Sequence, residues 1–259
     1  IGNPLYQSPI YNDDGVNERP IVYNVGNMTA PTANMPSLRN IDEVQTVFHE
    51  FGHGMHGMFT RAAYRSQTGT SVDRNMVELP SQINEHWATE PEVMKVYAKH
   101  YKTGETIPDE LIAKMEAADK FNQGFTTTEL CAASLLDLEW HKQPYTGHVD
   151  VAEFEKKVSE KLGKPELVEY RYRSPYFRHI FASNGYASGY FTYLWAEVLD
   201  SDGFELFKEK GIFDPETARS YRENILEPGD SEDAMTLYTK FRGHKPSPDA
   251  LLRRRGLAE

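Results

Sequence analysis

Apolar residues recur at helical spacing along most of the chain. The clearest case lies between residues 40 and 59, where they are three or four positions apart, as on one face of a helix. Asn40 or Asp42 is placed to cap the first turn. The pattern predicts a helix that ends near Phe59. The residues of its apolar face are Val44, Val47, Phe48, Phe51 and Met55.

A second helical pattern follows a polar stretch, residues 60–73, in which Gly69 lies between two threonines. We expect a loop there, with room for a short hairpin. Pro80 should kink the second helix or lie in its first turn. The apolar side of this helix carries Met76, Leu79, Ile83 and Trp87.

Prolines and glycines mark further helix ends. Pro91 and Pro215 suit first-turn positions, and Gly163 and Gly211 suit C-terminal ends. Residues 1–40 are rich in Pro, Asn and Gly and hold one strand-like run at 20–25. We therefore expect a mainly α fold with a small β element near the N-terminus. No repeat or linker-like break divides residues 1–259, which predicts one domain.

Composition narrows the class of protein. A hydrophobic content of 39% over 259 residues is enough for a sizeable core. The formal charge of 28 − 39 = −11 argues against nucleic acid or an anionic membrane surface as a partner. No run approaches the ~18 apolar residues that a membrane span needs, so no membrane partner is expected.

Cys131 is the single cysteine, which excludes an internal disulfide framework and a cysteine-rich metal site. Any metal must then be held by histidines and carboxylates. A lone cysteine fits a reducing compartment, so the cytoplasm is slightly favoured over the periplasm, and the sequence leaves the localisation open. The chain begins at Ile1 without an initiator methionine, so we expect its natural start to lie upstream or to have been removed.

Two histidines lie four positions apart in His49-Glu50-Phe51-Gly52-His53, within the predicted helix. At ~100° per residue they are about 40° apart around the axis, so both imidazoles can reach one ion. Glu50 projects between them and can accept a proton from a water at the metal without acting as a ligand. Zinc suits two imidazoles and a carboxylate, with a fourth position left for water. The motif therefore predicts a catalytic zinc site.

The third ligand has several candidates. His56 lies two turns from His49, ~10 Å along the axis, so one ion cannot bind both. The longer motif H-E-x-x-H-x-x-G-x-x-H is excluded, because His56 and Phe59 occupy its glycine and final histidine positions. Glu78 and Glu85 both qualify by their distance along the chain.

Two blocks resemble the catalytic core of the thimet oligopeptidase and peptidyl-dipeptidase family of zinc metallopeptidases. They are residues 49–59 and the segment Asp73-Arg74-Asn75-Met76-Val77-Glu78-Leu79-Pro80-Ser81-Gln82. The resemblance implies a multihelical, zincin-type catalytic domain with Glu78 as the third zinc ligand. It leaves Glu85 and His86 as supporting or packing residues. The extension Ile83-Asn84-Glu85-His86-Trp87 is similar to the peptidyl-dipeptidase branch, whose members release dipeptides from free C-termini.

Tyr186, Tyr190 and Tyr193 lie at i, i+4 and i+7, which predicts three phenols on one helical face. Such a face is either an aromatic core or a set of donors for an oxyanion. The segment 179–193 resembles the family's His…Gly-Tyr…Tyr segment. This resemblance implies that His179, Tyr186 and Tyr193 bind substrate and stabilise the oxyanion, with Tyr190 as a further substrate contact.

Two further substrate contacts are open alternatives. Gly185 can let the backbone approach a bound peptide closely, or it can simply loosen the start of a helix. Arg74 can pair with a substrate carboxylate, although the sequence alone favours a surface salt bridge.

The resemblance extends from about Pro20 to the C-terminal end, and members of the family are longer at the N-terminus. We therefore expect a C-terminal catalytic portion whose partners are short peptides and the absent N-terminal helical part. The expected activity is zinc-dependent hydrolysis of short peptides with release of C-terminal dipeptides. An endo-acting oligopeptidase and a zinc-stabilised module without activity of its own are the alternatives.

Overall fold

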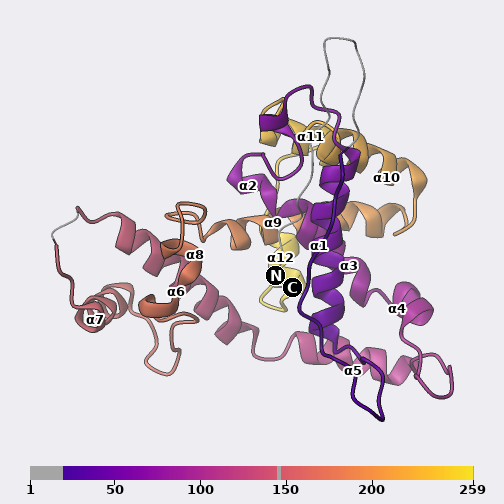
Figure 1. The fold of residues 1–259 in the computed structure, drawn as a ribbon, viewed down its shortest axis with the longest axis horizontal. Helices are drawn as coiled ribbons and strands as arrows, with labels where there is room; N and C mark the ends of the chain where they lie inside the picture. Colours follow the sequence, from indigo (N-terminus) through magenta and orange to yellow (C-terminus); the bar gives the residue numbers. More distant parts are fainter. Residues whose placement is uncertain (1–19, 145–146, 259) are drawn as a thin grey trace.

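The computed structural model describes residues 20–144 and 147–258, which form a mainly helical fold (Figure 1). Residues 1–19, the first half of the expected N-terminal extended region, lie outside the described residues. The longer helices are α1 (Ile41–Phe59), α3 (Leu79–Thr89), α5 (Asp109–Asp119), α6 (Gln123–His141), α7 (Val151–Leu162), α9 (Thr192–Lys210) and α11 (Ala234–Arg242). The shorter ones are α2 (Arg74–Val77), α4 (Pro91–Tyr97), α8 (Arg178–Phe181), α10 (Pro215–Tyr221) and α12 (Asp249–Arg254).

No residue within 20–144 or 147–258 belongs to a continuous strand. The run at 20–25 is extended and has one bridge position, Tyr23. Asn24 in this run donates its Nδ2–H to the carbonyl of Glu50, at 3.0 Å, which fixes the extended segment against α1. Isolated bridges also join Thr32 to Met35 and Lys99 to Thr106.

The helix predicted over 40–59 is confirmed by α1. Asn40 Oδ1 accepts the backbone N–H of Glu43 at 2.8 Å, and Glu43 Oε2 accepts that of Asn40 at 3.1 Å. This reciprocal capping box satisfies two amides that have no partner within the helix. The helix ends at Phe59, because Thr60 turns to φ −50° and ψ 137°.

The second predicted helix is divided at Glu78 into α2 and α3. Pro80 lies in the first turn of α3, one of the two outcomes expected for it. The loop at 60–73 contains a 3₁₀ turn, Arg65–Gln67, and none of its residues pairs as a hairpin.

The other helix-end predictions are also confirmed. Pro91 begins α4 and Pro215 begins α10. Gly163 ends α7 at φ 61°, and Gly211 ends α9 at φ 115°.

The main core forms where α1 lies along α3 and α3 packs on α9. In Figure 1, α7 and α8 lie to the left of this main core, and α6 and α9 run between them and the core. None of the described helices is long and apolar enough to span a membrane. The main core is built by Met76, Leu79, Ile83, Leu199, Phe204, Phe207, Tyr221, Ile225, Leu226, Tyr238 and Phe241.

Candidate metal centre

Two histidines and one glutamate meet where α1 crosses the start of α3. One ligand atom from each of His49, His53 and Glu78 lies within 4.8 Å of the other two. Oε2 of Glu78 is 3.5 Å from Nε2 of His49 and 3.3 Å from Nε2 of His53. Two imidazoles and a carboxylate converging on one point match the donor set that zinc prefers. Within the described part of the chain, no other group of histidines, cysteines and carboxylates has this geometry.

Glu85 contacts the cluster from the outside. Its Oε1 is 2.6 Å from Nδ1 of His49, and a carboxylate can only accept, so the hydrogen lies on Nδ1. In the neutral imidazole, the Nε2 atom of His49 then carries the lone pair, and it lies 3.5 Å from Oε2 of Glu78. Burial lowers the pKa of His49, but the hydrogen bond and charge of Glu85 outweigh it, and the net pKa is raised. Glu85 therefore holds the His49 ring and is not part of the converging set.

Glu78 is held in place by two hydroxyl groups. Ser81 Oγ donates to Oε2 and Tyr186 Oη donates to Oε1, each at 2.9 Å. Burial alone would raise the pKa of Glu78, but hydrogen bonds and charge from His53, with contributions from His49 and Tyr186, lower the pKa to about 2. The carboxylate is therefore ionised at neutral pH and available to a cation.

Glu50 is buried beside the cluster, with only 6% of its surface exposed. Its Oε1 has no hydrogen-bond partner among residues 20–144 and 147–258. A buried carboxylate oxygen without a partner is costly to keep, and such groups tend to occur at functional sites. The structure thus places Glu50 beside the predicted ligands while leaving it free to bond something else.

The prediction of one helical tyrosine face is wrong. Only Tyr193 lies in α9, whereas Tyr186 and Tyr190 lie in the turn that precedes it. Ser188 has φ 57°, a left-handed conformation that interrupts the helix. The turn still gathers the phenols, because the Tyr186 and Tyr193 rings stack at 5.4 Å and the Tyr190 and Tyr193 rings meet at 5.2 Å.

His179 completes this aromatic group. Its ring centre is 5.5 to 6.4 Å from those of Tyr186, Tyr190 and Tyr193. Burial, with a smaller effect of the Arg171 charge, lowers the pKa of His179, so its imidazole is neutral at neutral pH. Burial also raises the pKa of Tyr186 to about 12 and raises that of Tyr193. Tyr186 joins this aromatic group to the metal cluster, because its hydroxyl donates to Glu78.

Arg74 lies over the aromatic group, and the surface salt bridge considered for it is not found among the described residues. Its guanidinium carbon is 5.0 Å from the centre of the Tyr186 ring, a cation–π contact. Gly185 is close by, since a Cβ there would be 3.1 Å from Ser183 Oγ and 3.9 Å from Arg74 Nη1. Arg74 and Gly185 therefore both lie beside Tyr186.

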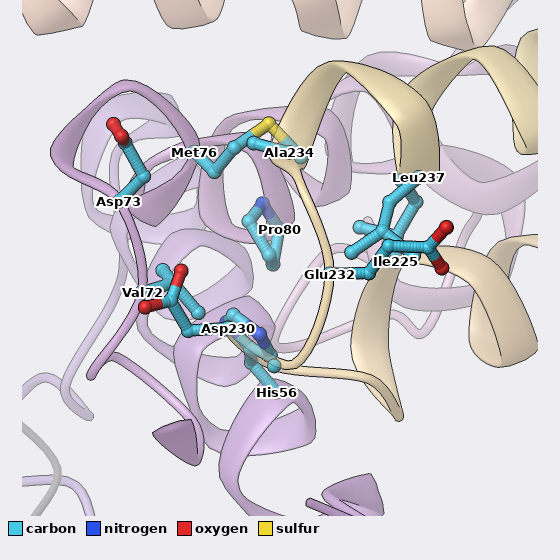
Figure 2. Close-up of a pocket in the computed structure, with 11 residues that line it drawn as sticks. His56, Val72, Asp73, Met76, Pro80, Ile225, Asp230, Glu232, Ala234 and Leu237 are labelled. Carbon is cyan, nitrogen blue, oxygen red and sulfur yellow. The ribbon is translucent and has the colours of Figure 1, made fainter. Parts of the chain in front are cut away.

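His56 lies apart from the metal cluster. It is 2% exposed, and neither ring nitrogen has a hydrogen-bond partner among the described residues. Figure 2 shows it at one end of a small cavity whose other polar groups include Asp73 and Glu232. The cavity offers about 10 Å³ to the centre of a water molecule, the space of roughly one water. It is therefore too small for a peptide.

Some contacts of the site are not marked by any local motif. Glu85 contacts His49, which is 36 positions away in sequence. Nε2 of His86 is 2.8 Å from Oδ1 of Asp200, which is 114 positions away. Asp137, a buried carboxylate on α6, accepts backbone amides from the tyrosine turn 51 and 53 positions away. Its only local signal is an acidic residue next to the apolar Leu130, Ala133 and Leu136 of α6.

Comparison with known proteins agrees with this geometry. Residues 5–257 match peptidase family M3. A dipeptidyl carboxypeptidase of Escherichia coli K12 is 46% identical over 241 residues, which cover 92% of this chain and 35% of that protein. Oligopeptidase A of the same strain is 40% identical over 250 residues, or 94% of this chain and 36% of that protein. A thimet-like oligopeptidase of Dictyostelium discoideum is 31% identical over 246 residues, with 94% and 36% covered.

The helical fold brings the two histidines of the H-E-x-x-H motif on α1 to Glu78 at the start of α3. This arrangement is typical of the active site of a metallopeptidase. The chain belongs to peptidase family M3, a family of metallopeptidases. It spans about a third of the length of the curated relatives it matches.

Proposed function

We propose that this chain is the zinc-binding catalytic part of a peptidase that hydrolyses short peptides and releases C-terminal dipeptides. The observation that carries the proposal is the position of Glu50. A buried carboxylate without a partner lies beside two imidazoles and a second, ionised carboxylate. A purely structural zinc site has no use for such a base, which speaks against a module without activity of its own.

The zinc ligands would be His49, His53 and Glu78. The hydrogen on Nδ1 of His49 and the low pKa of Glu78 leave the lone pairs that a cation needs. Zinc bound there would polarise the peptide carbonyl and lower the pKa of a water molecule.

Glu50 would act as the general base and acid. It takes a proton from the attacking water and returns it to the leaving amine. Its partner-free Oε1 is the atom available for this transfer.

Tyr186, Tyr193 and His179 would stabilise the negative charge on the carbonyl oxygen. Raised pKa values keep both phenols protonated at neutral pH, so they can donate hydrogen bonds. Tyr186 donates its single hydrogen to Glu78, so its hydroxyl would turn from this proposed ligand to the carbonyl oxygen when the peptide binds. Side-chain donors suit a site built on helices, where backbone amides are already paired. Gly185 would contact the peptide beside these donors. Tyr190, expected as a further contact, is only 3% exposed and would instead support the Tyr193 ring from below the surface.

Release of dipeptides requires recognition of a free C-terminus. Arg74 is exposed, contacts the Tyr186 ring and has no ion pair among the described residues. Its guanidinium is therefore available to donate hydrogen bonds to a peptide carboxylate. The greater identity to a dipeptidyl carboxypeptidase than to oligopeptidase A favours the same reading. An endo-acting oligopeptidase with the same chemistry is the second candidate, supported by the 40% identity to oligopeptidase A.

We further propose that a segment equivalent to the rest of the relatives' length completes the peptide site. The outer face of α1 exposes apolar side chains next to the cluster, with Val47 at 47% and Phe51 at 49%. A covering segment would bury them and hold the peptide, and such orientation contributes about 7–11 kcal/mol to catalysis. Zinc binding by this chain alone with feeble turnover is the expected behaviour.

The mass of the products tests the mode of cleavage. A peptide with a free C-terminus should lose successive dipeptides, and the same peptide with an amidated C-terminus should resist. The Glu50→Gln variant serves as the inactive control. Equal internal cleavage of both peptides would establish the endo-acting alternative.

A further inference from the structure

Asp137 is a buried acidic residue on the face of α6 that packs against the tyrosine turn. Leu130 and Ala133 on this face join Tyr190 in one buried cluster. Asp137 follows one turn later and is completely buried. A buried carboxylate requires hydrogen-bond donors, and most of those here come from the tyrosine turn.

The turn supplies two backbone amides. Ser188 N–H donates to Oδ1 of Asp137 at 3.0 Å, and Tyr190 N–H donates to Oδ2 at 2.9 Å. His141, one helical turn further on, places Nδ1 2.8 Å from Oδ1 and 2.9 Å from the carbonyl of Asp137. Because both neighbours are acceptors, Nδ1 of His141 carries a hydrogen. Both oxygens of the carboxylate are therefore used, and one of them is fixed from α6 itself.

The residue at the first of these contacts, Ser188, is strained. Ser188 is one of two non-glycine residues with positive φ in the described part of the chain, the other being Asn122. Such a conformation persists only where the surroundings enforce it. The Asp137 carboxylate accepts hydrogen bonds from the backbone amides of Ser188 and Tyr190, so it holds this turn in place.

The conformation of this turn also determines where the tyrosine hydroxyl groups point. Tyr186 lies just before Ser188 and donates to Glu78, while Tyr190 lies just after it and packs on α6. An ordinary helix over this segment would spread the phenols along one face and would remove the amides from Asp137. The left-handed residue is thus what brings Tyr186 back over Tyr193.

We propose that Asp137 is a positioning residue, which holds the Tyr186–Tyr190 turn against α6 and thereby orients the phenols toward the metal cluster. This inference rests on the proposed function for its effect on turnover. Its structural part, the enforcement of the turn, is independent of that function.

The test compares variants of Asp137 and Ser188 in the purified protein. Asp137→Asn replaces one acceptor by an NH₂ group that opposes a backbone N–H. A displacement of about 1 Å at a catalytic group lowers turnover by about 10²-fold, so we expect a loss of that size in kcat with less change in KM. The zinc content should stay that of the parent, and the near-ultraviolet circular dichroism of the tyrosines should change.

Adding Ser188→Gly to Asp137→Asn provides the rescue. Glycine adopts a positive φ without help from the carboxylate, so the double variant should regain most of the lost kcat. Ser188→Val, at an exposed position, strains the turn while leaving Asp137 intact and should lower kcat in the same direction. Ala182→Val is the matched control, since Ala182 is exposed and has φ −77°.

Parental kcat and tyrosine dichroism in both Asp137→Asn and Ser188→Val would overturn the inference. So would a double variant no better than Asp137→Asn alone. If Asp137→Asn does not fold, Ser188→Val and Ala182→Val alone decide the matter. Turnover is measured with the rest of the relatives' length supplied to every variant. A parent that binds zinc but still cleaves no peptide under that condition would refute the proposed function, and the dichroism of the same variants would still test Asp137.

Discussion

Gly52 of α1 faces the backbone carbonyl of Pro80 so closely that a Cβ on Gly52 would lie 2.2 Å from that oxygen. The same Cβ would be 2.7 Å from the Cα of Ser81. Only a hydrogen fits there, so α1 and α3 touch backbone to backbone. This contact brings Glu78, two residues before Pro80, to His49 and His53.

Gly52→Ala should therefore force the two helices apart. Overpacking of a closed contact destabilises by about 1–3 kcal/mol, and movement of Glu78 should also weaken zinc binding. Gly54→Ala is the matched control in the same helix, because its Cβ would meet Asn24 Nδ2 at an ordinary 3.6 Å. That variant should be neutral or stabilised by roughly 0.5–1 kcal/mol through helix propensity. Urea unfolding and metal analysis check both, and equal behaviour of the two variants would contradict the backbone contact.

Glu85→Ala should weaken zinc binding without abolishing it. Loss of a carboxylate that orients a ligating histidine lowers metal affinity by about 10–100-fold. Glu85→Gln keeps an acceptor for Nδ1 of His49 and should lose less. Glu92→Ala, at an exposed position of α4, should bind zinc as the parent does. Competition with a coloured chelator measures each affinity, and a loss as complete as that of Glu78→Ala would make Glu85 the ligand.

Tyr193→Phe deletes one proposed donor while keeping the ring that stacks on Tyr186. Removal of an oxyanion donor lowers kcat by about 10²–10³-fold, with less effect on KM. Tyr176→Phe, at a position 58% exposed, is the control and should be silent. Steady-state kinetics on a short peptide decides this. A change confined to KM would make Tyr193 a ground-state contact.

His56 should make the fold sensitive to acid. Burial, aided by the charge of His53, lowers the pKa of His56 from 6.5 to about 3. Between these values the unfolded chain binds a proton that the folded chain excludes, so stability falls as the pH falls from 6.5 toward 3. The slope from this residue is at most about 1.4 kcal/mol per pH unit.

The measurement is denaturant unfolding of the chelated protein between about pH 5 and 7. His56→Phe cannot titrate, so its free energy of unfolding should depend less on pH than that of the parent. His148→Gln, at an exposed position, should keep the parental dependence. An unchanged pH dependence in His56→Phe would show that His56 is not held neutral.

Local patterns predicted the parts of the fold that local chemistry determines. The spacing of Val44, Val47 and Phe51 and the cap at Asn40 act within a few residues, so α1 was predicted with its correct ends. The prolines of α4 and α10 act in the same way. The zinc motif lies inside α1, which explains why His49, His53 and Glu50 could be proposed together.

Contacts between residues far apart in sequence could not be predicted from local patterns. Glu78 and Glu85 are seven positions apart, and their spacing alone did not separate a ligand from its support. The structure brings Glu78 to both Nε2 atoms and Glu85 to Nδ1. The tyrosine prediction failed because periodicity ignores Asp137, which bonds the turn across 51 positions and stabilises a left-handed Ser188. Gly185 and Gly189, on either side of Tyr186, were the available signal for a break in the helix.

The central claim is that His49, His53 and Glu78 form a zinc site served by Glu50. The zinc content of the folded parent, Glu50→Gln and Glu78→Ala, determined by atomic emission after dialysis, tests it most directly. We expect about one zinc per chain in the parent and in Glu50→Gln, and almost none in Glu78→Ala, because three protein ligands are the usual minimum for such a site. A folded parent that binds no zinc, or a Glu78→Ala variant that retains it, would contradict the account.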